Sequence, residues 1–499
     1  MKPEPTTRMT VGQALVAFLA QQWTLDGALA QRTVPGVFGI FGHGNLAGLG
    51  QALHHVAGED PERLPYLRAR NEQAMVHQAV GYARAQRRRA TYAVTTSVGP
   101  GTANLVTGAA LATANRLPVL LVVSDTFSTR VADPVLQQLE HPHDPARQVC
   151  EALRPVSRFY ARVERGEQLF SIALAALRVL TDPAETGAVT IVLPEDVQAE
   201  AIDVPSDFLA QRRWHLYRPP PDPAALARAV TAIRAANRPL LIAGGGVFYA
   251  GAEAAVRALA ELTGIPVATT QAGGGVLPPD HPQHLGGIGV TGGTAANSVA
   301  RQADLIIGVG TRYGDFTTAS NSLFAHPDVA FVNLNIAAFD AAKRTQLPVI
   351  CDARAGLDGL RVELAGLRVD PAYAAEVTAA KRAWDDVVDQ ALQPTGRDVP
   401  GQPEILGAIA GALGPRDAIV AAAGSLPGDL QKLWRPAEAL GYHVEYGFSC
   451  MGYEIAGGLG YQRGLRALGD DREVVVLVGD GSYLMLHTEL ATAAADGIR

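Results

Sequence analysis

Cysteine is scarce in this sequence, and the few cysteines present lie far apart. The 499 residues include three of them, Cys150, Cys351 and Cys450. This spacing excludes a zinc-binding cluster and a disulfide framework, both of which need closely or regularly spaced cysteines. Widely separated, unpaired cysteines are typical of proteins that stay in a reducing compartment, so we predict a cytoplasmic protein.

Charge and long apolar runs are limited as well. Charged residues make up 18% of the chain and the net charge is −7, so no overall basic field would attract nucleic acid. The longest apolar stretch, 11–20, is interrupted by Gln13; it is too short to span a membrane and lacks the basic start and cleavage site of a signal peptide. The one dense basic run, 84–89, is interpreted as the solvated end of a helix, where cations favour the dipole, with a polyanion site as the alternative. We therefore predict no nucleic-acid partner and no membrane partner.

Short apolar runs alternate with longer helical patterns along the chain. Strands that are apolar on both faces and separated by helices indicate parallel sheets with helices on each side. Because 499 residues exceed a single core, we predict an α/β fold with three doubly wound parallel-sheet domains, at residues 1–202, 221–366 and 400–499. The clearest predicted strands are Val37–Phe41, Tyr92–Thr96, Val119–Val123, Val189–Leu193, Leu240–Ala243, Val267–Thr270, Leu305–Val309, Phe331–Leu334, Ile419–Ala423 and Val474–Val478.

Two stretches separate the predicted domains. Residues 203–223 are polar and contain several prolines, which is typical of a linker, and residues 370–402 combine a helix with a second linker. The third domain has only two clear strands, which would leave an apolar sheet edge uncovered. We expect residues outside this sequence to complete that domain, so that 400–499 is its N-terminal part only.

The most informative local motif follows the last predicted strand. There the sequence reads Gly479-Asp480-Gly481-Ser482, and a helix is predicted from about Tyr483. The glycines allow a sharp turn and a close approach to a ligand, while free N–H groups at a helix start favour a phosphate. Asp480, at the carboxyl end of a parallel strand, is suited to hold a hard cation. The alternative is that Asp480 and Ser482 only cap the helix.

A second motif lies near the start of the chain. Asn71 is suited to cap a helix, which places Glu72 in the first helical turn. A lone glutamate there would simply favour the helix dipole. Its neighbours favour a functional role over a dipole effect alone, because Gln73 and His77 follow on the same predicted helix.

Taken together, these segments resemble a known family. Asn71-Glu72-Gln73, His77, residues 81–84 and residues 96–101 resemble the pyrimidine-binding domain of thiamine diphosphate enzymes of the acetolactate synthase type. Gly479-Asp480-Gly481 resembles the start of that family's diphosphate-binding motif, and residues 448–460 resemble the stretch before it. The motifs occur in the family's order and cover essentially the whole chain. The resemblance implies the thiamine diphosphate-binding fold, with thiamine diphosphate and Mg2+ as cofactors.

The resemblance also implies roles for individual residues. Glu72 would hydrogen-bond the cofactor's pyrimidine ring and favour the imino tautomer, which needs a largely dry setting. Met451 resembles the bulky residue that holds the cofactor bent, although a core gap-filler is the alternative. The turn of Gly479, Asp480, Gly481 and Ser482 would bind the diphosphate, with Asp480 on the metal.

Further segments narrow the resemblance to the hydrolases of bacterial inositol catabolism. Those enzymes open the ring of 3D-(3,5/4)-trihydroxycyclohexane-1,2-dione to give 5-deoxy-D-glucuronate, so the implied substrate is a small polyol-derived diketone. A hydrolase must orient water, for which His43, His77 and Gln138 are the candidates; for each of them the alternative is an ordinary structural side chain. The segments that carry this resemblance are 36–45, 133–138, 154–158, 180–189 and 445–453.

Several alternatives stay open at this point. An acetolactate synthase-like carboligase and a catalytically inert homologue are the rival functions. The family's second side-chain metal ligand is an asparagine after the Gly-Asp-Gly turn, but the 19 residues after Asp480 (499 minus 480) contain none, so we expect that ligand outside this sequence. The family places the cofactor between subunits, which implies a homodimer or homotetramer. The Gly244–Gly246 loop could hold a nucleotide, but it lacks the full dinucleotide spacing, and structural turns are the preferred interpretation.

Overall fold

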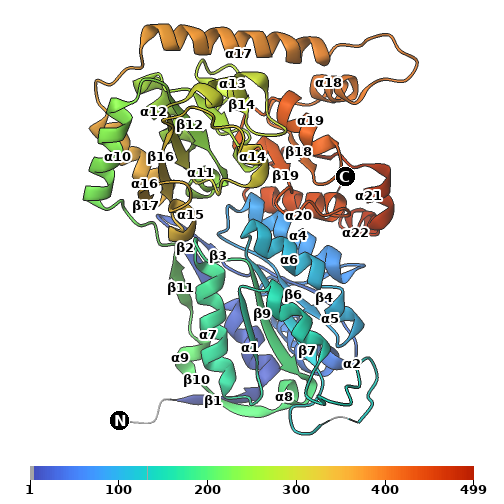
Figure 1. The fold of residues 1–499 in the computed structure, drawn as a ribbon. Coiled ribbons are helices and arrows are strands. Elements are labelled where there is room, and N and C mark those ends of the chain that lie inside the picture. The colour runs from blue at the N-terminus through green and yellow to red at the C-terminus, as the bar shows by residue number, and fades with distance from the viewer. Residues whose placement is uncertain (1–4, 132, 499) are drawn as a thin grey trace. The chain divides into compact units, whose positions relative to one another are not determined.

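The structure, a computed structural model, describes residues 5–131 and 133–498 (Figure 1). The chain divides into two compact units. Unit 1 comprises residues 1–217, 447–471 and 480–499, and unit 2 comprises residues 218–446 and 472–479. Among the described residues, no helix is both long enough and apolar enough to cross a membrane.

A six-stranded parallel sheet forms the centre of unit 1, as far as the described residues go. Its strand order is β5-β4-β6-β7-β9-β8. The middle strands β7 and β9 are buried along their whole length, as expected for a sheet covered on both faces. The strands are β4 (Val37–Ile40), β5 (Tyr66–Arg68), β6 (Ala93–Thr96), β7 (Val119–Asp125), β8 (Phe159–Arg162) and β9 (Ala188–Pro194). The helices that pack around it include α1 (Val11–Ala20), α3 (Gln51–Glu59), α6 (Val106–Asn115) and α7 (Gln168–Thr181).

The direction in which this sheet is built reverses between β4 and β6. From β4 the chain continues to β5 on one side, whereas from β6 it continues to β7 on the other. In open α/β sheets, ligands bind outside the carboxyl ends of the strands at such a reversal. Three helices begin near this edge: α2 (His43–Asn45), α4 (Glu72–Ala85) and α5 (Pro100–Ala103).

Helix α4 packs closely against α20 (Glu454–Ala467), and Figure 1 shows the two side by side. A Cβ atom on Gly81 would lie 2.1 Å from the carbonyl oxygen of Gly457, and one on Gly460 would lie 2.0 Å from that of Gln78. Since such distances are too short for any side chain, glycine is required at both positions. The approach brings the turn before α20 next to the start of α4.

Unit 2 contains a second six-stranded parallel sheet in its described residues, with the order β14-β13-β12-β15-β16-β17. Helices α10, α12 and α16 pack on one apolar cluster and α13 and α17 on another. The strands are β12 (Pro239–Ala243), β13 (Val267–Thr269), β14 (His284–Gly287), β15 (Leu305–Val309), β16 (Ala330–Asn335) and β17 (Leu347–Ile350). The helices are α10 (Pro223–Ala235), α12 (Glu253–Thr263), α13 (Thr294–Gln302), α16 (Ala353–Glu363) and α17 (Pro371–Ala391).

The glycine-rich loop after β12 closes onto the loop after β15. The Gly246 N–H donates to the Gly310 carbonyl at 3.0 Å, and a Cβ atom on Gly244 would lie 2.5 Å from that carbonyl oxygen. Gly310 itself has φ +60°, a conformation that favours glycine. The loop glycines therefore serve this backbone-to-backbone contact, in agreement with the structural interpretation of the loop.

A smaller parallel sheet of three described strands, β19-β18-β20, also lies in unit 2. Its strand β19 is absent from the sequence-based prediction, which recognised only the other two. Helices α18 and α19 accompany this sheet, whereas α20, α21 and α22 belong to unit 1. The bounds are β18 (Ala418–Ala421), β19 (Tyr442–Val444), β20 (Val474–Val476), α18 (Gln402–Ala412), α19 (Leu426–Leu433), α21 (Asp480–Met485) and α22 (Leu490–Ala495).

Two local predictions are wrong. The 203–223 stretch is not simply a linker, because β10 (Ala201–Pro205) pairs with β1 (Thr6–Thr10) and β11 (Arg212–His215) pairs with β2 (Gln22–Asp26). The basic run is not a solvated helix end either. Arg84 is buried inside α4, and the Arg88 guanidinium donates to the carbonyls of Asn115 and Pro183. Hydrogen bonds to backbone carbonyls that are distant in the sequence therefore account for the position of the Arg88 side chain.

Candidate active site

Glu72 stands at the first position of α4. The side chain of Asn71 caps the helix by accepting from the Ala74 N–H at 3.1 Å, as the sequence predicts. The Glu72 carboxylate is half-buried, and its Oε2 accepts a hydrogen bond of 3.0 Å from the Asn104 side-chain amide. Its Oε1 lies 3.3 Å from the position of a Cβ on Gly101. Glu72 is thus held at the carboxyl edge of the first sheet, facing the β6–α5 turn.

The polar atoms around that turn have fewer partners than burial normally demands. The Thr96 and Ser97 hydroxyl oxygens and the Gln138 Oε1 are buried and make no hydrogen bond within the described structure. Buried polar atoms without partners are rare in native proteins and call for an explanation such as a ligand. The carbonyl of Gln137 packs against Gly99, where a Cβ would lie only 1.8 Å away. This places the Gln138 segment over the same turn.

These observations test whether the residues fit a thiamine cofactor. An aminopyrimidine carries ring nitrogens and an exocyclic amine that need both donors and acceptors. A glutamate beside two unpartnered hydroxyls and an unpartnered amide oxygen offers such a set. The pyrimidine end of the cofactor therefore fits the carboxyl edge of β6.

His77 lies further along α4 and is fully buried. Its Nδ1 is 3.3 Å from the Gly452 carbonyl and its Nε2 is 3.5 Å from the Gln73 side-chain nitrogen. Burial lowers the pKa of His77 to about 4, and the hydrogen bond to Gly452 acts in the opposite direction. The ring is therefore neutral at pH 7. Because a carbonyl can only accept, Nδ1 carries the proton, and the ring ties α4 to the turn before α20.

His43 is placed differently from His77, at the exposed start of α2. Beneath it, the Asn45 side chain accepts from the Gly42 N–H at 2.9 Å and donates to the Thr95 hydroxyl at 3.3 Å. Glu195 follows β9 directly; burial raises its pKa, and the nearby His43 acts in the opposite direction. His43 and Glu195 thus both follow strands, β4 and β9, at the carboxyl edge of the sheet.

The turn of residues 479–482 is next to Met451. A Cβ on Gly481 would lie 3.4 Å from the Met451 methyl carbon. The Met451 side chain is 41% exposed, so it does not fill a gap in the core. The Asp480 carboxylate is exposed and accepts from the Gly481 N–H at 2.7 Å. Gly479 is exposed too, and no described atom outside its chain neighbours lies within 4 Å of the position that a Cβ would take. Both Met451 and Asp480 are therefore open to a ligand.

Ser482 is already occupied by protein contacts. It is buried, accepts from the Gly452 N–H at 2.7 Å and donates to the buried carboxylate of Glu454. Its hydroxyl therefore stabilises the turn that also contacts His77. No group of three or more His, Cys, Asp or Glu side chains suited to a metal ion is found among residues 5–131 and 133–498. Of the two carboxylates at this turn, Glu454 is buried and Asp480 is exposed.

Two residues of this edge were not identified from the sequence. Asn104, which holds Glu72, follows the short helix α5, and Glu195 comes directly after the last residue of β9. A signal existed for Glu195, because acidic residues at the carboxyl end of a parallel strand face the ligand crevice. No comparable signal marks Asn104, whose contact with Glu72 joins residues 32 positions apart.

Comparisons with known proteins cover most of the chain. Residues 9–145 match the family described as "Thiamine pyrophosphate enzyme, N-terminal TPP binding domain". Residues 226–360 match its central domain, and residues 422–499 match its C-terminal TPP binding domain. These matches follow the order that the motifs predict.

Curated relatives with high similarity carry one activity in their names. The chain is 46% identical to the 3D-(3,5/4)-trihydroxycyclohexane-1,2-dione hydrolase of Geobacillus thermodenitrificans, over 99% of this chain and 79% of the relative. It is 46% identical to hydrolase 1 of the same name from a strain of Bacillus cereus, over 98% of this chain and 78% of the relative. The Bacillus anthracis hydrolase is also 46% identical, over 98% of this chain and 78% of the relative.

Proposed function

The chain belongs to the thiamine pyrophosphate enzymes, among the 3D-(3,5/4)-trihydroxycyclohexane-1,2-dione hydrolases, and we propose that it hydrolyses the carbon–carbon bond between the two carbonyls of that cyclic dione. Water is consumed: one carbonyl carbon gains the hydroxyl and becomes a carboxylate, and the other gains a hydrogen and becomes an aldehyde. The observation that carries the proposal is that Glu72 faces the turn after β6 at the sheet reversal, where buried polar atoms of Thr96, Ser97 and Gln138 have no partner among the described residues.

Thiamine diphosphate, when bound, supplies a nucleophilic carbon and an electron sink. Glu72 would hold a proton at a ring nitrogen of the pyrimidine. Its half-buried setting and the Asn104 amide keep the carboxylate aimed in one direction, so it needs little reorganisation. Met451 would support the cofactor beside the Gly479–Ser482 turn, to which it is already adjacent. Backbone N–H groups of the turn at Gly479, Asp480 and Gly481 would bind the diphosphate.

We also propose that Mg2+ accompanies the cofactor, with Asp480 as one ligand. Its carboxylate is exposed and accepts from the adjacent Gly481 N–H, which leaves further lone pairs for a cation, and hard cations with phosphates are commonly held by one or two carboxylates. Ser482 would contribute by shaping the turn, because its hydroxyl is taken up by Gly452 and Glu454.

Three side chains are proposed to handle the water. His43 is exposed at the ligand edge, where its ring nitrogens can hydrogen-bond a water molecule. Gln138 brings an amide oxygen that has no partner among the described residues and can accept from water. His77 is fully buried and neutral, which suits an indirect contribution through Gln73 and Gly452.

The working protein is proposed to be a cytoplasmic homodimer or homotetramer. Exposed apolar side chains on unit 1 support assembly: Leu136 is 75% and Leu484 71% exposed, and a second copy would remove such surface from water. The cysteines support the compartment, since all three are free thiols. Sedimentation velocity tests the assembly, and a purely monomeric holoenzyme would contradict it.

An end-point assay tests the reaction. The full chain, supplied with thiamine diphosphate and Mg2+, is incubated with the cyclic dione, and products are followed by NMR. We expect one carboxylate and one aldehyde per dione consumed, without any requirement for pyruvate. Condensation of pyruvate without dione consumption would instead identify a carboligase, and no binding heat with thiamine diphosphate would identify an inert homologue.

A further inference from the structure

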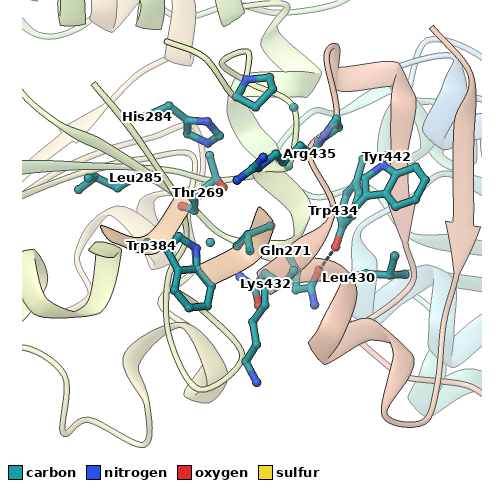
Figure 2. A pocket seen from close by; sticks show the side chains of 18 of the residues that line it. Thr269, Gln271, His284, Leu285, Trp384, Leu430, Lys432, Trp434, Arg435 and Tyr442 are labelled. Atoms are coloured by element: carbon teal, nitrogen blue, oxygen red, sulfur yellow. Dashed lines mark hydrogen bonds between the residues drawn. The ribbon is translucent and has the colours of Figure 1, made fainter. Parts of the chain in front are cut away.

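Unit 2 contains a pocket separate from the edge that holds Glu72. It lies beside the edge strand β14 and the carboxyl end of β13, and α17 and α19 close it from the other side (Figure 2). The space between its walls, open mouth included, is about 620 Å³. Because its walls come from the central sheet and from the segments that follow it, a ligand there would contact both.

The first feature of this pocket is a buried acceptor without a donor. His284 opens β14, is 8% exposed, and its Nε2 makes no hydrogen bond within the described structure. The ring hydrogen-bonds the Pro278 backbone, and burial lowers the pKa of His284 to about 4. The neutral ring donates to the carbonyl through Nδ1, so Nε2 is left as an acceptor. A ligand hydroxyl would satisfy it.

The second feature is an excess of positive charge. Lys381 pairs with Asp385 at 2.8 Å, and Arg435 pairs with Asp389 and, at 3.5 Å, with Asp385. Lys432 also lines the pocket, but it forms no ion pair with the residues that the structure describes. An anionic group on a ligand would balance this remaining cation.

The third feature is aromatic. Figure 2 shows Trp384 on one side of the pocket and Trp434 with Tyr442 on the other. The Trp384 ring is held in place by Gly293, where a Cβ would lie 2.5 Å from its Nε1. The Tyr442 hydroxyl donates to the Gln271 amide oxygen at 2.6 Å. These residues form rigid walls with flat apolar faces, typical of small-molecule sites.

We propose that this pocket binds a small hydroxylated carboxylate. A ligand hydroxyl donates to His284, the carboxylate pairs with Lys432, and the carbon skeleton lies between the two indoles. The choice of ligand class rests on the proposed function, because hydrolytic opening of a hydroxylated cyclic dione yields a molecule of this kind. The site would let the enzyme bind its product class away from the reacting centre.

The test measures binding of D-glucuronate to the full chain by calorimetry, without thiamine diphosphate or metal, and by tryptophan fluorescence. We expect saturable binding that His284→Ala weakens by about tenfold, the loss of one buried hydrogen bond. Lys432→Gln should weaken it similarly and should make D-glucuronate bind no better than neutral D-glucose.

The matched control is His281→Ala. His281 is also buried, at 7% exposure, and lies three residues before His284, but it is not among the residues lining the pocket. It should leave D-glucuronate affinity unchanged. Lys432 is half-buried and has no ion-pair partner in the described part of the chain, so Lys432→Gln keeps the test valid if His284→Ala fails to fold.

Specific outcomes would overturn the proposal. One is the absence of binding heat with D-glucuronate, and another is wild-type affinity in the His284→Ala and Lys432→Gln variants. A third is loss of D-glucuronate binding in Glu72→Gln, which would place the ligand at the edge that holds Glu72. Failure of the dione assay would overturn the proposed function while leaving D-glucuronate binding in unit 2 intact, so the two failures are distinguishable.

Discussion

The two six-stranded sheets share an architecture but differ at the point where each reverses direction. In unit 1 the reversal lies between β4 and β6, and the buried hydroxyl of Thr96 there has no partner among the described residues while Glu72 faces it. In unit 2 it lies between β12 and β15, and the loops of Gly244–Gly246 and Gly310 close onto each other through backbone hydrogen bonds. The same topology thus presents an open polar edge in one case and a closed glycine contact in the other.

The difference teaches that topology locates a crevice but does not say whether it is used. Both sheets would be expected to bind a ligand at the reversal. What separates them is whether the buried polar groups are satisfied within the protein. That distinction should govern ligand binding at the reversal in unit 1 and stability at the reversal in unit 2.

The largest stability effect is expected from Gly310→Ala. The residue has φ +60°, and a Cβ would lie 2.5 Å from the Gly246 Cα. We expect a loss of about 2–4 kcal/mol in the free energy of unfolding, from the left-handed conformation and overpacking together. Urea unfolding measures it.

Gly101→Ala is the partner experiment in unit 1. Its Cβ would meet the Thr96 hydroxyl at 2.3 Å and the Glu72 carboxylate at 3.3 Å, which are side-chain atoms. We expect a smaller loss of stability than in Gly310→Ala, about 1–2 kcal/mol, because a side-chain hydroxyl can move more easily than backbone atoms, while thiamine diphosphate affinity falls at least about tenfold. Equal stability losses in the two variants would remove the distinction.

A pH effect of intermediate size should come from the buried histidines, one in each unit. Burial lowers the pKa of both His77 and His284 to about 4, so the unfolded chain binds protons more readily below pH 6.5. The contribution of each buried, neutral histidine to the free energy of unfolding is therefore present above that pH and is lost as the pH falls toward 4. For each histidine, the free energy of unfolding should fall by about 2 kcal/mol between pH 7 and pH 5. Urea unfolding of His77→Gln should show a smaller loss over this interval, and an unchanged loss would refute the burial argument.

The smallest effect is expected from Thr96→Val. Because the Thr96 hydroxyl is buried without a partner in the described structure, its removal should raise stability by about 1 kcal/mol in the cofactor-free protein. The same change should weaken thiamine diphosphate binding. Thr95→Val is the control, since the Thr95 hydroxyl accepts from Asn45; it should lower stability instead. A destabilised Thr96→Val would mean that its hydroxyl has a protein partner.

The strands were largely predictable because buried parallel strands are continuous apolar runs. The prediction for β7 stopped at Val123, whereas the strand reaches Asp125, whose carboxylate accepts from Arg162 at 2.7 Å. A polar strand end of this kind is indistinguishable from a loop until its partner is known. The three-residue strand β19 was missed for a similar reason, since its central residue, His443, is polar yet buried.

The local backbone of the candidate site was predictable in parts. The capped helix start at Glu72 and the turn that leads into α21 were predicted, because turns and helix starts leave local signatures. The functional roles of these residues stay predictions. The environment of each side chain was not predictable. His77 is buried against Gly452, 375 residues away, and Ser482 is engaged by Glu454. Contacts over such separations depend on the packing of α4 against α20.

The most direct test of the account is dione turnover by Glu72→Gln in the full chain with thiamine diphosphate and Mg2+. The amide cannot hold the proton as a carboxylate does, so turnover should fall by on the order of a hundredfold or more, with the thermal unfolding midpoint unchanged. Glu62→Gln, an exposed control, should retain full activity. Near-normal turnover in the stably folded Glu72→Gln protein would contradict the central claim.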